Sequence, residues 1–306
     1  MKHTLKITLI LMMFFILTQA TGLYIINKDI TVTLEDGEKV ITHADTIMGE
    51  RPDLEPKDSF ISIVLAILVG TILALILIKL KLFYVWNIWF FFAVLFSSAL
   101  ALGVFLPAWW AFSISLVLTL LKYFKTNILT HNISELLIYP GIALIFVPIL
   151  NVFWIIALLL VISLYDMYAV WKSKHMVKLA EFQSKSNKFA GFMIDYKCKD
   201  KVKTSVMSKK KVKVQTCEGQ KAILGGGDIF FPLLFSGVFM EHLIVTNGLS
   251  KLTSLLLVFL VTISVSIALF LLFYKSEKGK YYPAMPFLSA GCMLGYSLVY
   301  IVLSFM

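Results

Sequence analysis

The chain has 306 residues, of which 59% are hydrophobic and only 15% are charged, and its mean hydropathy is +0.87. Soluble globular chains are about 45–50% apolar and about 25% charged, so this composition excludes that class and indicates a polytopic membrane protein. The net charge of +10 would suggest a nucleic-acid partner in a soluble protein. Here the lysines lie between apolar runs, where they indicate membrane topology, and no nucleic-acid partner is expected.

Nine apolar runs are long enough, or nearly long enough, to cross a bilayer. They cover residues 7–26, 60–78, 83–105, 108–121, 136–150, 152–171, 222–245, 252–273 and 285–306. We predict an all-α fold of nine transmembrane helices in one membrane domain, with six spans in 1–171, a basic loop in 172–221 and three spans in 222–306. The first run also resembles a secretory signal peptide, but it continues beyond the length that a signal needs, which favours a retained span.

The distribution of lysine predicts the orientation in the membrane. If the N-terminus is inside, 23 of the 28 basic residues lie on the inner side, fourteen of them in 172–221. Beyond segment 27–58, the outer loops then carry only Lys251. Because cytoplasmic loops of membrane proteins are rich in Lys and Arg, we predict an N-terminus inside and a C-terminus outside. The chain is expected to be a multi-pass protein of the cell membrane.

Two loops have patterns of their own. Segment 27–58 has nine acidic and four basic residues; its residues 30–34 alternate like a strand, and Glu35-Asp36-Gly37-Glu38 favours a turn. It therefore fits a small hairpin or a solvated loop. Most of 172–221 is expected to be attracted to anionic lipid head groups. Within it, 211–216 alternates polar and β-branched residues, which predicts an edge strand able to pair with an extended peptide.

Two carboxylates lie deep inside apolar runs. Asp166 is about 6 residues from the inner end of its run, and Asp228 is about 7 residues from the inner end of the next. At 1.5 Å per helical residue, both lie roughly 9–10 Å from the inner boundary. Since an aspartate at mid-bilayer costs roughly 2.5–3.5 kcal/mol on insertion scales, each is a candidate functional residue. Their matched depth on consecutive antiparallel spans allows the two side chains to meet.

A pair of neighbouring carboxyls suggests acid and base chemistry. Both cannot ionise cheaply, so they share one proton; the ionised member can act on a water and the protonated one on a carbonyl oxygen. Gly225, Gly226 and Gly227 precede the second acid and leave room for another backbone to approach it. On the same inner side, Pro283-Ala284-Met285-Pro286 lacks two backbone donors, and such irregular backbone is tolerated in a membrane where it lines a cavity.

These motifs resemble those of a known family. Tyr165-Asp166, Gly225-Gly226-Gly227-Asp228 and Pro283-Ala284-Met285-Pro286 resemble the YD, GxGD and PAL motifs of presenilins and signal peptide peptidases. The resemblance covers mainly 152–306 and is closer to an archaeal presenilin homologue, because the basic 172–221 loop points inward; Met285 replaces the family leucine.

The resemblance implies nine spans and cleavage of single-span substrates within the membrane. It implies that Asp166 and Asp228 are catalytic, and that Tyr165, the three glycines and 283–286 position the substrate. No metal or organic cofactor is implied. The active site is expected on the cytoplasmic side, and neither a homo-oligomer nor accessory subunits are excluded.

Two other functions compete with this one. A type IV prepilin peptidase also uses a GxGD motif, but the PAL-like segment and the Tyr-Asp pair on a consecutive span argue against it. A proton-coupled transporter would use the two aspartates as a relay; transporters usually contain internal repeats, and the two halves of this sequence show none. The three cysteines, whose spacing fits neither a zinc site nor a disulfide framework, add no further candidate; they are Cys198, Cys217 and Cys292.

Overall fold

The computed structural model describes residues 5–35, 38–124, 127–173, 189–196, 203–207, 210–214, 220–277 and 282–305. Within these ranges the chain forms nine α-helices. They are α1 (Leu5–Asp29), α2 (Pro56–Lys79), α3 (Phe83–Gly103), α4 (Ala108–Phe124), α5 (Ile128–Phe146), α6 (Val152–Met167), α8 (Gly226–Val245), α9 (Lys251–Lys275) and α10 (Met285–Ser304). A single π-helical turn, η1 (Tyr168–Lys172), continues α6.

Three small antiparallel sheets accompany the helices. Their strands are β1 (Ile30–Glu35) with β2 (Glu38–His43), β3 (Gly191–Tyr196) with β6 (Gln220–Gly225), and β4 (Lys203–Met207) with β5 (Lys210–Val214). The fold is therefore mostly helical and differs from the all-α prediction by these strands. Of the two alternatives for 27–58, the structure has the hairpin, because β1 pairs with β2 from Ile30–His43 to Glu35–Glu38.

Eight of the described helices are long and apolar enough to cross a membrane. The remaining one, α4, is apolar but has only 17 residues, so the count of nine spans stays a prediction. Two boundaries differ from those expected. The fifth helix covers Ile128–Phe146 rather than 136–150, and the seventh predicted span begins at Gly226 rather than Ala222. Most of the predicted 172–221 loop, including 174–188, lies outside the described residues.

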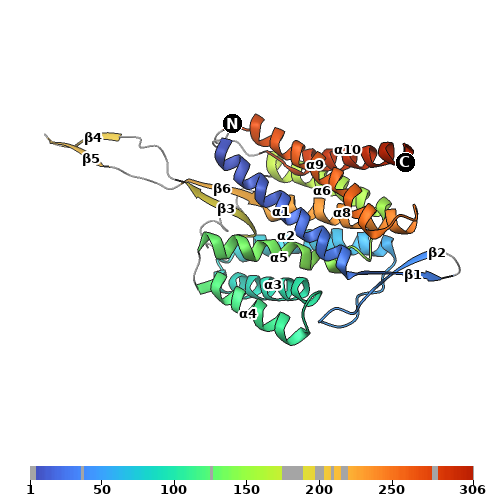
Figure 1. Cartoon of the computed structure of the whole chain (residues 1–306). Coiled ribbons are helices and arrows are strands. Elements are labelled where there is room, and N and C mark those ends of the chain that lie inside the picture. Colours follow the sequence, from blue (N-terminus) through green and yellow to red (C-terminus); the bar gives the residue numbers. More distant parts are fainter. Residues whose placement is uncertain are drawn as a thin grey trace.

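The helices run between two ends of the molecule (Figure 1). The start of α1 and the sheet β3–β6 lie at one end, and the hairpin β1–β2 and the end of α10 lie at the other. This arrangement agrees with an odd number of crossings. Which end faces the cytoplasm remains the prediction made from the lysines.

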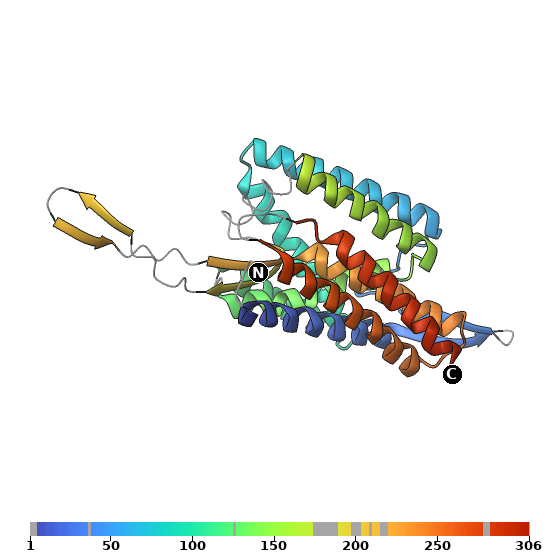
Figure 2. The same cartoon turned by 90° about the horizontal axis from the view of Figure 1, so that it is seen from above.

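Helix α8 lies at the centre of the bundle. In its 18-residue apolar stretch 67% is buried, whereas in that of α2 only 11% is buried. Figure 2 shows α2 and α6 side by side along one flank of the bundle. On another side, α10 packs closely on α9 through Gly291 and Gly295. A Cβ on Gly295 would lie 2.5 Å from Cα of Val261, so this helix pair depends on small residues four apart, as is common between membrane helices.

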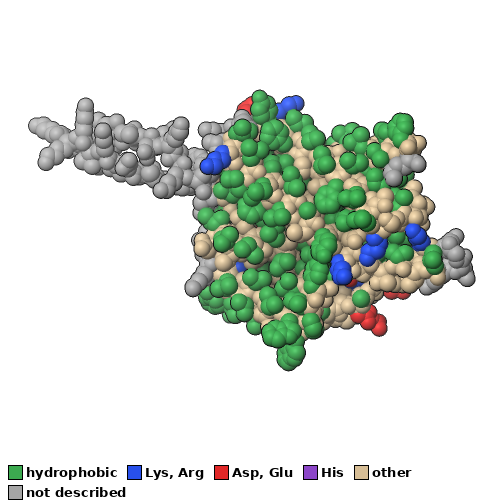
Figure 3. All heavy atoms as spheres, in the orientation of Figure 1, with side chains coloured by type: hydrophobic (Ala, Val, Ile, Leu, Met, Phe, Trp, Pro, Cys, Tyr) green, Lys and Arg blue, Asp and Glu red, His purple; other side chains and the backbone are tan. Residues whose placement is uncertain are grey.

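Apolar side chains are spread over the whole face seen in Figure 3, and charged ones lie mostly toward its margins. Exposed apolar residues occur on several helices, among them Val69 on α2, Trp109 on α4 and Leu252 on α9. In water so much exposed apolar surface would be unfavourable, and in a bilayer it faces hydrocarbon. The surface therefore fits an integral membrane protein.

A charge cluster fastens the β1–β2 hairpin to the bundle. His43 in β2 lies between two carboxylates, 2.9 Å from Asp29 at the end of α1 and 3.2 Å from Glu241 on α8. Arg51 pairs with the same Asp29 at 2.8 Å. Burial alone would lower the pKa of His43, but its interactions with the two carboxylates outweigh burial and raise that pKa to about 9. The ring is therefore charged at neutral pH and links α1, the hairpin and α8.

Candidate active site

Asp166 lies in the last turn of α6, just before the π-helical turn η1, and is buried. Its Oδ2 accepts a hydrogen bond from the backbone N–H of Met285 at 3.1 Å, and the N–H of Ala284 also donates to the carboxyl. One turn earlier on α6, the hydroxyl of Ser163 lies 2.8 Å from that of Ser289 on α10. The acid is thus held against the start of α10, which is the predicted Pro-Ala-Met-Pro segment.

Asp228 is the third residue of α8 and is partly exposed. The backbone N–H of Gly225 donates to its carboxyl, and the carboxyl interacts electrostatically with Asp166. A carboxylate in the first turn of a helix is also favoured by the helix dipole. The structure therefore places the two acids within electrostatic range of each other, as their matched depth allows.

The three glycines before Asp228 have different surroundings. A Cβ on Gly225 would lie 3.2 Å from Oδ2 of Asp228, and one on Gly226 would lie 2.8 Å from the hydroxyl of Tyr139 on α5. Gly227 is exposed, and a Cβ there would meet only the ring of Phe231 at 3.7 Å. Gly226 permits a close approach between α8 and α5, while Gly227 leaves the space in front of the acid open.

The strand that leads into α8 is β6, and β3 is its partner (Figure 1). A strand was predicted at 211–216, and Lys210–Val214 does form one, β5. It pairs with β4 in a separate hairpin rather than leading into α8, and 215–219 lie outside the described residues. Ala222, Ile223 and Leu224 belong to β6, although their apolar character had suggested the start of a helix.

The edge of β6 that faces away from β3 carries backbone groups with no strand beside them among the described residues. The backbones of Gly191 and Met193 in β3 bond to side chains of α5, so they point away from β6. Their partners Gly225 and Ile223 consequently face away from β3 as well. This outward edge ends at Gly225, three residues before Asp228.

The other predicted positioning residues are divided between the site and its surroundings. Met285 and Pro283 are buried, and Ala284 and Pro286 are partly buried, at the junction with Asp166. The hydroxyl of Tyr165 donates to Oγ1 of Thr71 on α2 at 2.9 Å, so this hydrogen bond joins α6 to α2. Among the described residues, no group of three or more His, Cys, Asp or Glu could hold a metal ion.

Sequence reasoning missed one polar cluster behind the site. His131, Asn132 and Glu135 on α5 contact the backbone of β3, and they precede the run that had been predicted as the fifth span. Their spacing of i, i+1 and i+4 places them on one side of a helix, and this periodicity was the available signal.

Comparisons with known proteins point to one family and fold. A family model described as "Signal-peptide peptidase, presenilin aspartyl protease" matches residues 44–305. Two solved structures of presenilin family intramembrane aspartate proteases, in C222 and P2 space groups, share the fold. The first has 16% identity and a TM-score of 0.59 and aligns over 96% of this chain and 99% of the other. The second has 18% identity and a TM-score of 0.52, with 95% and 96% covered.

At 16% and 18% identity, the two structures show only that the fold is shared. The family is therefore assigned from the family model. No curated protein matches the chain. The family model covers well over half of the sequence, including both acids and the segment before α10. The chain therefore belongs to the signal-peptide peptidase and presenilin family of aspartyl proteases.

Proposed function

We propose that this protein is an intramembrane aspartyl protease of the GxGD type that cleaves single-span transmembrane substrates, with Asp166 and Asp228 as its catalytic pair. The observation that carries the proposal is the junction of three segments distant in sequence. Asp166 is held by the backbone of Ala284 and Met285 and interacts with Asp228, which follows the glycines at the start of α8. The family assignment supports the same chemistry.

The chemistry follows from two carboxyls that share one proton. The ionised carboxyl removes a proton from a water, whose oxygen attacks the carbonyl carbon of the peptide bond, while the protonated carboxyl donates to the carbonyl oxygen. Collapse of the tetrahedral intermediate, with a proton passed to the leaving nitrogen, breaks the C–N bond. In such a dyad, the apparent pKa values belong to the pair of carboxyls rather than to either residue.

A helical substrate has to unwind before its carbonyl can be reached. The outward edge of β6 offers the backbone groups of Ile223 to an extended chain, and the exposed Gly227 leaves room beside Asp228. An added strand there would satisfy its own backbone groups, which is required at membrane depth. In the predicted orientation this edge, and so the site of cleavage, faces the cytoplasmic side of the cell membrane.

The test is cleavage of a single-span reporter in liposomes by wild type, Asp166→Asn and Asp228→Asn. Each isosteric change should lower kcat by about 10⁴-fold. The two carboxyls act as one catalytic unit, so removing either one abolishes the contribution of both. Asp53→Asn, at an exposed position between β2 and α2, is the matched control. The proposal fails if a folded variant lacking either acid still cleaves at the wild-type rate, or if wild type cleaves no reporter. Loss of proton-coupled uptake in both variants would then favour the transporter.

A further inference from the structure

Side chains of α5 hold one edge of β3. Nε2 of His131 lies 2.8 Å from the carbonyl oxygen of Gly191, and Oε2 of Glu135 accepts the N–H of the same residue at 3.0 Å. Asn132 bonds to Met193 twice, donating to its carbonyl at 3.0 Å and accepting its N–H at 3.2 Å. On the side of β3 away from β6, side chains of α5 therefore occupy the backbone groups of Gly191 and Met193.

Glu135 is the centre of this contact and is fully buried. Besides the N–H of Gly191, its carboxylate accepts hydrogen bonds from Lys122 on α4 and from the hydroxyl of Tyr139. Lys122 is 5% exposed. A buried ion pair often adds little to the stability of a protein, although removing one partner leaves a costly unpaired charge. The presence of this pair is therefore better explained by the local geometry that it holds in place.

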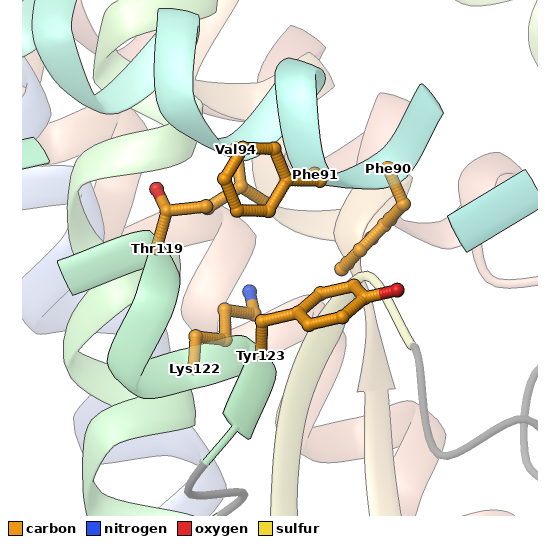
Figure 4. Close-up of a pocket in the computed structure, with 6 residues that line it drawn as sticks. All are labelled: Phe90, Phe91, Val94, Thr119, Lys122 and Tyr123. Atoms are coloured by element: carbon orange, nitrogen blue, oxygen red, sulfur yellow. The ribbon is translucent and has the colours of Figure 1, made fainter. Parts of the chain in front are cut away.

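The surroundings of Lys122 explain why its ammonium stays with Glu135. The side chain lines a small pocket between α3 and α4 (Figure 4), together with Phe90, Phe91, Val94, Thr119 and Tyr123. The ammonium lies 5.2 Å from the centre of the Phe90 ring. The pocket is lined mainly by apolar and aromatic groups, so Glu135 is the anionic partner of this cation.

From β3 the contact continues to Asp228. β3 pairs with β6 along six residue pairs, from Gly191–Gly225 to Tyr196–Gln220. The N–H of Gly226, the first residue of α8, donates to the carbonyl of Ala190 at 3.1 Å. Tyr139, which donates to Glu135, lies against Gly226. Both the strand and the tyrosine thus connect Glu135 to the start of α8.

We propose that Glu135, with Lys122 as its counter-ion, is a positioning residue that sets the place of Asp228 through β3 and Tyr139. The inference rests on the proposed function, since it assigns these residues to the same site. Lys122 fixes the carboxylate, the carboxylate fixes the backbone of Gly191, and β3 fixes β6 and Gly226. A small displacement of β3 therefore shifts Asp228 relative to Asp166.

The experiment compares Glu135→Gln, Lys122→Met and the double variant in the liposome assay. Each single change leaves one buried charge unpaired and should lower kcat about ten- to hundredfold with little change in KM, because small misplacements of reacting groups have effects of that size. The double variant removes both charges and keeps an oxygen able to accept the N–H of Gly191. Its kcat should recover to within about threefold of wild type, since paired charges can be replaced together at little cost.

Two matched controls test whether the effect is specific. Ser134→Ala, on α5 beside Glu135, and Thr119→Val, one turn before Lys122, remove buried hydroxyls that bond only within their own helices. Both should cleave like wild type. A second measurement, hydrogen exchange of the β3 amides, is independent of catalysis. Glu135→Gln and Lys122→Met should accelerate exchange at Gly191–Tyr196, and the double variant should restore protection.

The outcomes separate the two proposals. Loss of kcat and faster β3 exchange in the single variants, with both reversed in the double variant, supports positioning. Wild-type kcat in a folded Glu135→Gln overturns the positioning role and leaves the proposed function intact. A loss of kcat that becomes larger in the double variant has the same consequence. If wild type cleaves no reporter, the proposed function fails and the positioning role fails with it, whatever the exchange shows.

Discussion

The backbone N–H of Met285 lies 3.1 Å from Oδ2 of Asp166. Met285 is the first residue of α10, and Asp166 is in the last turn of α6, 119 residues earlier. A backbone donor cannot be altered by most substitutions, so this segment holds the acid whatever the side chain is. The methionine found where the family motif has leucine is consistent with that role.

Removing this donor should impair cleavage. Met285→Pro lacks the N–H and is acceptable at the first position of a helix, and the loss of a hydrogen bond to a charged group should lower kcat about ten- to hundredfold. Met285→Leu keeps the donor and should stay within about threefold of wild type. Ala284 has helical angles that a following proline disfavours, so thermal unfolding is measured on both variants. A folded proline variant with wild-type kcat would contradict the prediction.

Gly226→Ala and Gly227→Ala should differ in thermal stability. The methyl group at 226 would lie 2.8 Å from the Tyr139 hydroxyl, which Glu135 holds in place, and such overpacking costs about 1–3 kcal/mol. At 227 the nearest neighbour is 3.7 Å away, and replacing glycine by alanine in a helix favours folding by up to about 1 kcal/mol. Unfolding in detergent tests this. Equal melting temperatures for the two variants would count against the close approach at Gly226.

Tyr165→Phe and Thr71→Val should act on the same contact between α6 and α2. Each removes one partner of the 2.9 Å hydrogen bond and should lower the free energy of unfolding by about 1 kcal/mol. The double variant should lose little more than either single one, because the two changes remove one interaction. Since the hydroxyl faces α2, kcat for Tyr165→Phe should change only a few-fold. Fully additive losses in the double variant would show that the bond does not contribute.

The β1–β2 hairpin should loosen from the bundle at alkaline pH. The pKa of His43 is raised from 6.5 to about 9, so the stabilisation by its charged form is complete below pH 6.5 and is lost as the pH rises through 9. A shift of this size corresponds to at most about 3.4 kcal/mol. His43→Gln should remove the difference in melting temperature between pH 6 and pH 9.5. A wild-type profile in the glutamine variant would rule out His43 as its origin.

Hydropathy predicted most of the bundle because the bilayer fixes the length of a span. The runs 60–78 and 252–273 correspond to α2 (Pro56–Lys79) and α9 (Lys251–Lys275), with only the polar ends missing. The hairpin was also predictable, since alternation at 30–34 is local. The electrostatic interaction of Asp228 with Asp166 agrees with their matched depth, because a membrane constrains where a charge can be placed.

The sheet β3–β6 could not be predicted in the same way. Ala222-Ile223-Leu224 adjoins a long apolar helix, and a run of three residues has no measurable period that separates strand from helix. Its partner Phe192-Met193-Ile194 lies some thirty residues earlier in a lysine-rich loop, so the pairing depends on a contact distant in sequence. The polar start of α5 was missed because hydropathy registers the apolar part of a helix and not its buried polar side.

Helix α8 is fastened at both ends, by the strand that enters it at Gly226 and by the pairing of Glu241 with His43 at 3.2 Å. A translation or rotation of α8 would break one of these connections, so its position within the bundle is fixed. Asp228 therefore has a fixed place at the start of α8, and the position of Asp166 relative to it depends on α6 and on the segment before α10 that holds Asp166.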